Sequence, residues 1–243
     1  MRFPAIGVAL LCSLAASGAA TRQVSPYWAS AVESAETTPD TQCATSNRVA
    51  LDEMLLGVKG KRQFWTRTPE LVVLTSVMAY RGPSGVDSVG LPEQLTRADA
   101  DALEADLTDA LRLLSDGTYA QFAAIHREPV AAGARTALSR PGQIVVGRFA
   151  GLRTQSHTIG FGGRAARADG SISGGAVILD RDFDQTSNQR ALLRMHELGH
   201  ALGYNHVLSQ TSIMNPSIGP SPTPFDRMAV QAATDRNRTR SAN

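Results

Sequence analysis

The segment HELGHALGYNH, residues 196 to 206, constrains the fold more than any other part of the chain. It holds three of the five histidines in the sequence, together with one glutamate. On an α-helix, His196 and His200 are one turn apart, so both rings leave the same face about 6 Å from each other. Gly203 suits the left-handed backbone that ends a helix, after which the chain can turn back. We therefore predict that His206 returns to the same point and that three imidazoles share one metal ion.

The donor set predicts the metal and its chemistry. Three imidazoles without a thiolate favour zinc, and they leave one tetrahedral position open for water, as in catalytic sites. Glu197 emerges about 100 degrees round the helix from His196, where its carboxylate could reach a zinc-bound water. Zinc lowers the pKa of that water to about 7, and a carboxylate can take its proton as the hydroxide attacks a carbonyl. This is the chemistry of peptide hydrolysis. The competing interpretation, unrelated surface histidines, requires this spacing to arise by coincidence in a chain with five histidines.

The pattern HExxHxxGxxH resembles the signature of the metzincin zinc proteases. Met214, in the segment SIMNPS, lies where those enzymes carry the methionine of their Met-turn, and Pro216 makes the spacing most similar to that of matrixins. The similarity extends more loosely over residues 65–235. It implies an α+β fold in which a twisted mixed β-sheet packs against two helices, with the zinc-binding helix under the cleft, then the Met-turn and a C-terminal helix. It also implies a zinc endopeptidase in which Glu197 is the general base and the zinc ligands are His196, His200 and His206.

The sequence departs from the matrixin pattern at several positions. Val207 stands where matrixins usually have serine. His157 lies where that family places one ligand of a second, structural zinc, but the partner histidine is replaced near Val177 and Ile178. We therefore interpret His157 and His126 as ordinary histidines.

Three alternating carboxylates raise the question of a calcium ion. Asp180, Asp182 and Asp184 follow an apolar run, and carboxylate oxygens are ligands that calcium accepts. The alternative is a solvated strand end, which we favour.

Residue patterns predict alternating strands and helices. The clearest helix begins at Thr96, a capping residue, and ends near Gly117. Leucines recur along it at helical spacing and are expected to be core: Leu103, Leu107, Leu111 and Leu114. Other helices are expected at residues 48–58 and 223–236, and the zinc-binding helix should begin with the capping pair Thr186 and Gln189. Strands are predicted at residues 70–80, 118–125, 142–151, 156–163 and 174–183.

The first twenty residues have the layout of a secretory signal peptide. Arg2 supplies a positive charge, residues 3–14 are apolar, and small residues follow at 16–20. This stretch is too short for a permanent membrane span. A lipoprotein signal at Cys12 is disfavoured because the preceding residue is bulky. We expect a secreted protein, extracellular or periplasmic, without stable membrane association.

Four segments follow from these patterns. Residues 1–20 are the signal peptide, residues 21–68 a pro-segment or N-terminal extension, residues 69–236 the catalytic domain, and residues 237–243 a tail. Removal of the signal leaves Cys43 as the one cysteine, so no intramolecular disulfide can form. Cys43 is either an unpaired thiol or, as the resemblance suggests, a thiolate that blocks the zinc until the pro-segment is cleaved. The sequence around it lacks the family's arginine and glycine, so we favour the first.

The partners expected for this chain are protein or peptide substrates. The net charge of +2 gives no basic stripe for nucleic acid, and we expect a monomer. By the resemblance, an extended peptide should pair with the edge strand at residues 156–163, and residues 215–222 should wall the specificity pocket. Two alternatives remain open. One is a secreted zinc-binding module without catalysis, and the other is a zinc amidase that cleaves cell-wall peptides.

Overall fold

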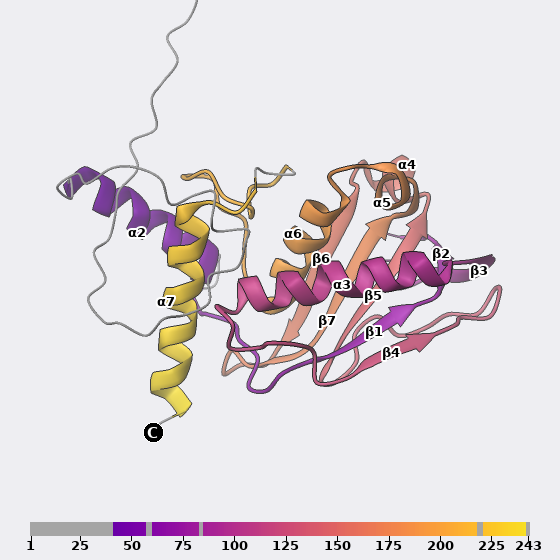
Figure 1. Cartoon of the computed structure of the whole chain (residues 1–243), viewed down its shortest axis with the longest axis horizontal. Coiled ribbons are helices and arrows are strands. Elements are labelled where there is room, and N and C mark those ends of the chain that lie inside the picture. Colours follow the sequence, from indigo (N-terminus) through magenta and orange to yellow (C-terminus); the bar gives the residue numbers. More distant parts are fainter. Residues whose placement is uncertain (1–40, 57–59, 83–84, 218–220, 242–243) are drawn as a thin grey trace, which may run out of the picture.

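A mixed β-sheet, covered by helices on one broad face and by a loop and a short helix on the other, forms the body of the structure, which is a computed structural model (Figure 1). The structure describes residues 41–56, 60–82, 85–217 and 221–241. The predicted signal peptide lies outside these residues. None of the described helices combines the length and the apolarity that a bilayer span needs. The predicted α+β class is confirmed.

The sheet is built around a central parallel pair, β5 and β7, to which the other strands add on both sides. On one side β5 pairs in parallel with β1 and then β2, which follow each other along the chain and break at Thr75. The outer edges of β1 and β2 pair with β4 and β3 respectively. On the other side β5 pairs with β7, and β6 closes that side as an antiparallel edge strand. The strand bounds are β1 Glu70–Leu74, β2 Ser76–Ala79, β3 Val89–Gln94, β4 Ile125–Glu128, β5 Gln143–Ala150, β6 Gly160–Ala166 and β7 Ile172–Asp180.

Helix α3, which packs on the sheet, forms where the leucine pattern predicts it. The side chain of Thr96 accepts from Asp99 N and caps the helix, so the predicted start is confirmed. The four predicted core leucines are all buried. The helix bounds are α2 Thr41–Leu56, α3 Arg97–Leu114, α4 Leu152–Ser156, α5 Arg181–Thr186, α6 Arg190–Leu202 and α7 Pro224–Ser241.

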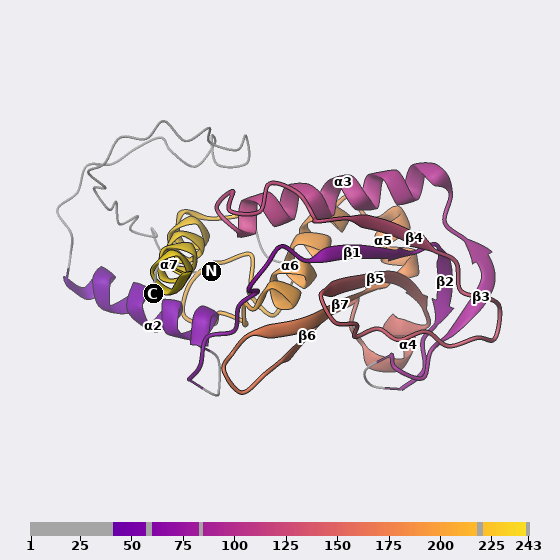
Figure 2. The same cartoon turned by 90° about the horizontal axis from the view of Figure 1, so that it is seen from below.

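The two faces of the sheet pack against different partners. Because side chains alternate along a strand, Leu71 and Val73 face the helices α3 and α6, whereas Val72 and Leu74 face the opposite side. The first set belongs to the large core that also holds α2 and α7. The second set packs under the 129–142 loop and α4. Figures 1 and 2 show α3 and α6 on the same side of the sheet. Helix α6, which carries His196 and His200, is therefore held between the sheet and α3.

Several predicted elements are wrong in position. Residues 118–124 form turns and the strand begins only at Ile125, because the chain first turns back after α3 through hydrogen bonds of Ser115. The 156–163 strand is displaced to β6, since α4 ends at Ser156 and His157 adopts a left-handed conformation. The predicted strand over 174–183 ends at Asp180, whose side chain caps α5. Thr186 ends α5 and therefore does not cap the helix predicted to bind zinc, α6, which begins at Arg190 without a side-chain cap.

Helix α2 is longer than the predicted 48–58 helix and packs into the large core. Ala50 and Met54 are fully buried and Leu55 is nearly so. The helix contacts α7, which continues beyond the predicted 223–236 helix to Ser241. The second half of α2 is thus packed against the same core as the predicted catalytic domain.

Candidate metal centre

The structure brings together the three histidines that the sequence singles out. His196 and His200 leave the same face of α6, and Gly203 ends the helix with φ of 114°. The chain then turns back so that His206 meets them. The Nε2 atoms of His196 and His200 are 3.2 Å apart, and those of His200 and His206 are 3.1 Å apart. Among the described residues, these three histidines are the group whose ligand atoms converge closely enough to hold a metal ion.

The ring geometry fits a tetrahedral metal. Zinc–nitrogen bonds of about 2.0–2.1 Å at tetrahedral angles place two ligand nitrogens about 3.3 Å apart. The two separations given above lie close to this value. Like-charged imidazolium rings would repel at such distances, so neutral rings, the form that can bind a cation, fit the arrangement better.

Hydrogen bonds fix the protonation of two rings. His196 Nδ1 lies 2.7 Å from the carbonyl of Ile213, and His200 Nδ1 lies 3.0 Å from that of Tyr204. A carbonyl can only accept, so Nδ1 donates in both rings and the Nε2 lone pair is free for a metal. Burial lowers the pKa of His196 and of His206, and it lowers the pKa of His200 to about 3. All three rings are therefore neutral at pH 7.

Met214 lies under the metal-binding helix. It is fully buried, and a Cβ added to Gly199 would lie 2.6 Å from its sulfur. The carbonyl of Met214 accepts from Val207 N at 2.9 Å, so the turn also holds the residue that follows His206. The sequence-predicted methionine thus contacts α6 at Gly199 through its sulfur and the loop after His206 through its carbonyl.

A buried carboxylate in α7 holds this turn. Asp226 accepts from Ile213 N at 3.0 Å and from Ser212 Oγ, and it also accepts from the backbone and hydroxyl of Thr223. Ile213 is the residue whose carbonyl binds the His196 ring. A chain of hydrogen bonds therefore runs from α7 to the His196 ring, and sequence reasoning missed it.

Glu197 packs against the edge strand β6. Its side chain is 5% exposed, and its carboxylate accepts from the amide of Gly162. Burial raises the pKa of Glu197 to about 8, although the hydrogen bond from Gly162 offsets part of the rise. A cation bound nearby would lower this pKa again, because it favours the charged carboxylate.

Two glycines in β6 allow α6 to approach this closely. A Cβ on Gly160 would meet the Glu197 carboxylate and lie 2.8 Å from Leu193, while a Cβ on Gly162 would overlap the backbone carbonyl of Glu197 and lie 2.7 Å from Cβ of His200. Any side chain at these positions would force the helix off the sheet. Glycine in a strand is a known mark of close backbone approach, so the GFGG segment carried a signal that could have revealed this contact.

Arg164, two residues further along β6, caps the end of α6. Its guanidinium donates to the carbonyls of His200 and Tyr204 at 2.9 and 3.1 Å, and to the side chain of Asn205 at 2.7 Å. These carbonyls lie at the C-terminal end of the helix, where a positive charge is favourable. The arginine therefore ties the turn before His206 to the sheet, a contact between residues far apart in the sequence.

The other candidate residues lie away from this centre. His126 is exposed and its Nε2 is 3.4 Å from Glu70 Oε2, while His157 ends α4. Cys43 lies in the first turn of α2, and its side chain is outside the described residues. Both views place this end of α2 away from α6, so coordination of the metal by Cys43 would require α2 to leave its position (Figures 1 and 2).

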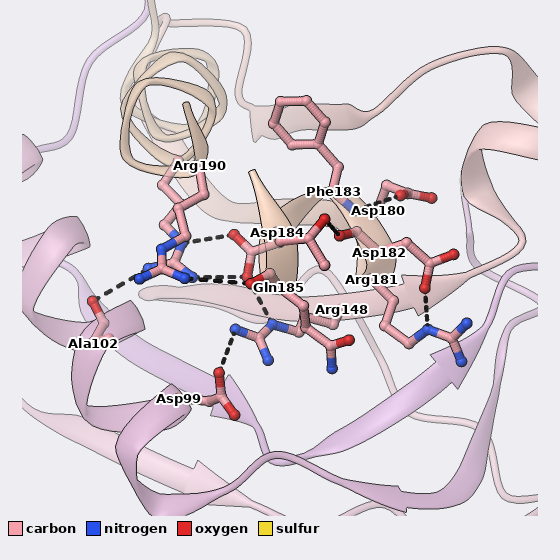
Figure 3. A network of polar contacts seen from close by, with 12 residues as sticks. Asp99, Ala102, Arg148, Asp180, Arg181, Asp182, Phe183, Asp184, Gln185 and Arg190 are labelled. Carbon is pink, nitrogen blue, oxygen red and sulfur yellow. Dashed lines mark hydrogen bonds and ion pairs between the residues drawn. The ribbon is translucent and has the colours of Figure 1, made fainter. Parts of the chain in front are cut away.

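The three aspartates considered for calcium do not converge, and the favoured solvated strand end is also wrong. Asp180 caps α5, Asp182 pairs with Arg181, and Asp184 is completely buried. Asp184 accepts from the guanidinium group of Arg148 at 2.7 Å (Figure 3). It accepts from the guanidinium group of Arg194 at 2.7 Å as well. Asp180 is therefore a helix cap, and Asp182 and Asp184 are counter-ions of arginines. Asp184 is buried with its two arginines because buried charges need partners of opposite sign.

This buried ion network anchors the metal-binding helix. Arg194 comes from α6, two residues before His196, and it also pairs with Asp106 of α3 at 2.7 Å. Arg148 comes from β5 and reaches Asp99 of α3 at 3.1 Å. The network therefore joins α3, α5, α6 and the sheet. Arg148, Arg194 and Asp184 at its centre are almost fully buried, whereas the two α3 carboxylates are partly exposed.

No protein-family model matches this chain, and no curated protein matches it significantly.

Proposed function

We propose that this protein is a zinc-dependent endopeptidase of the metzincin type, similar to matrixins. The convergence of three imidazole nitrogens on α6 and its following turn, beside the buried Glu197, is the observation that carries the proposal. The neutral, hydrogen-bonded rings are ligands that zinc prefers. The methionine packed beneath the helix and the sheet edge beside it agree with the same class.

The residues of the chain have separate tasks in this proposal. His196, His200 and His206 hold the ion, which supplies Lewis-acid activation of water and of a peptide carbonyl. Glu197 accepts the proton of the attacking water on its carboxylate and returns it to the leaving amine. Its packing against β6 excludes water on that side and keeps the carboxylate in one orientation.

The substrate strand would lie along β6 at residues 160–166. This strand pairs with β7 on one side, and no strand in the described part of the chain pairs with its other edge. Free amides and carbonyls on such an edge accept an extended peptide. The predicted pocket wall at residues 215–222 is described in part only, because residues 218–220 lie outside the described residues. We also propose export of the protein, from the signal-like first twenty residues.

Replacement of Glu197 by Gln tests the mechanism. Purified processed protein should contain about one zinc per chain in both parent and variant, while casein cleavage should fall at least about a hundredfold in the variant. Glu93→Gln, at an exposed position, is the matched control and should cleave like the parent. Equal cleavage by the Glu197→Gln variant would refute the mechanism.

The same assays separate the two alternatives. Peptidoglycan is offered in parallel with casein, and cleavage of peptidoglycan alone would favour the cell-wall amidase. Stoichiometric zinc without cleavage of either substrate by the parent would favour the non-catalytic zinc-binding module.

A further inference from the structure

The end of α2 holds the loop after α6 on the N-terminal side of His206. The backbone amide of Asn205 donates to the carbonyl of Met54 at 2.9 Å, and the side-chain amide of Asn205 donates to the same oxygen at 3.1 Å. The carbonyl of Met54 is one of the last four of the helix, which lack partners within it. Asn205 therefore satisfies a helix end and is fixed by it.

The same turn of α2 holds the loop on the other side of His206. Glu53 Oε2 accepts from Leu208 N at 2.9 Å, from Ser209 N at 3.1 Å and from Ser209 Oγ at 3.0 Å. Burial alone would raise the pKa of Glu53, but these three hydrogen bonds outweigh it and lower the pKa. Two adjacent residues of α2 thus straddle the third metal ligand.

His206 depends on this support more than the other two ligands do. His196 and His200 each have a ring nitrogen bonded to a backbone carbonyl, whereas His206 shows no such bond among the described residues. It is also the most exposed of the three and lies outside the helix. The position of its ring is therefore set by the backbone of its loop.

The supporting helix is itself firmly placed. Met54 and Ala50 are fully buried in the core shared with α7, so the residues that hold the loop cannot shift without opening that core. A third link, from Gln210 Nε2 to Asn47 Oδ1 at 3.0 Å, joins the loop to the preceding turns of α2.

We propose that Glu53 and the Met54 carbonyl position His206, and that residues 46–56 are a permanent part of the metal centre. Any processing that matures this protein then cuts before residue 46. The N-terminal region predicted at residues 21–68 is thereby divided into a removable part and a part that the site needs. This inference rests on metal binding by the three histidines, which the proposed function shares.

Cobalt binding to the full chain tests the role of Glu53. Metal is removed with a chelator and Co²⁺ is titrated, since its visible absorption reports both affinity and coordination. Glu53→Ala should weaken binding about ten- to a hundredfold, the usual effect of losing a partner outside the ligand shell, and should alter the absorption bands. Asp52→Ala, one residue away and exposed, is the matched control and should bind like the parent.

A purely stabilising role would give a different result. It predicts a lower unfolding midpoint for metal-free Glu53→Ala with unchanged Co²⁺ affinity and bands, and that outcome would overturn the inference alone. If Glu53→Ala does not fold, Ser209→Ala removes one of the three hydrogen bonds and should give a smaller loss of affinity; an unchanged affinity there would again overturn it. A parent protein that binds no Co²⁺ and no Zn²⁺ would overturn the proposed function as well.

The N-terminus of the exported protein supplies an independent readout. Sequencing of the mature chain from the medium should find its first residue at or before position 46. A first residue after position 46, in protein that still binds metal, would contradict the inference without touching the proposed function.

Discussion

The sulfur of Met214 packs against the backbone of Gly199, so closely that a Cβ on residue 199 would lie 2.6 Å from Sδ. Alanine normally stabilises a helix interior by about 1 kcal/mol relative to glycine. Here the overlap should outweigh that gain, because overpacking a full core costs about 1–3 kcal/mol. We predict that Gly199→Ala lowers the unfolding free energy and weakens zinc binding. A much smaller effect of Gly199→Ala in a Met214→Ala background than in the parent would attribute the effect to this contact, and a single variant as stable as the parent would exclude it.

The glycines of β6 make a sharper steric prediction. Gly162→Ala should cost several kcal/mol and abolish stoichiometric zinc, because its Cβ would overlap the backbone of α6. Gly163→Ala is the control, since its Cβ would meet only the Phe161 ring, at 3.1 Å, and that ring can move. Zinc content and unfolding curves of both variants check the difference. Equal tolerance of the two alanines would contradict the close approach of helix and strand.

Loss of Asp226 should loosen the turn at residues 212–215, which holds Met214. Asp226→Asn replaces one acceptor oxygen by an amide group that faces donors, so we expect a loss of about 2–3 kcal/mol in stability. Since Ile213 binds the His196 ring, zinc affinity should fall as well. Competition with a chelator measures this zinc affinity. Reduced stability with unchanged affinity would separate the turn from the ligand.

Asp184 is the shared, fully buried counter-ion of two buried arginines, and its removal leaves Arg148 paired with Asp99 and Arg194 with Asp106, both of which are partly exposed. Asp184→Asn should destabilise the fold by about 3–5 kcal/mol, as for other broken buried pairs. Asp182→Asn, whose side chain is 73% exposed, should change stability by less than about 0.5 kcal/mol. Denaturant unfolding of both variants tests the contrast, and similar values would mean that water compensates the arginines.

The raised pKa of Glu197 predicts a pH effect in the metal-free protein. The folded-state pKa of about 8 lies above the ordinary 4.5, so the folded state binds the proton more tightly. The contribution of protonated Glu197 to the unfolding free energy is therefore present in full below pH 4.5 and is lost as the pH rises through 8. This loss amounts to up to about 4 kcal/mol between pH 5 and 9. Metal-free Glu197→Gln should lack this loss. Parallel pH profiles of parent and variant would disprove the burial of a protonated carboxyl.

Local sequence patterns predicted the parts of this fold that local interactions determine. The leucine stripe and its threonine cap gave α3, because helical spacing and capping act within a few residues. The two histidines of α6, the glycine that ends it and the return of His206 follow from the same short-range geometry. The buried strands β1 and β5 were also evident from their β-branched residues.

The remaining features depend on contacts that no local pattern contains. β6 is rich in glycine, which is disfavoured in strands, so its position became clear only from the helix that covers it. Asp180 and Asp184 looked like a polar strand end because their partners, an α5 amide and two distant arginines, are set by packing. Glu53 and Arg164 hydrogen-bond to the segment around His206 although they lie far from it in the sequence. Asp226 binds the amide of Ile213 from a separate helix, α7.

Side chains along β6 point alternately to the two faces of the sheet, so its positions fall into two sets with different steric constraints. Residues 160, 162 and 164 face the metal-binding helix and tolerate almost no change in size or charge. Residues 161, 163 and 165 point the other way, and Phe161 is 46% exposed. Substitutions on this second set can therefore accumulate without disturbing His196 and His200, and a library randomised there would show whether this face of β6 influences the proposed peptide cleavage.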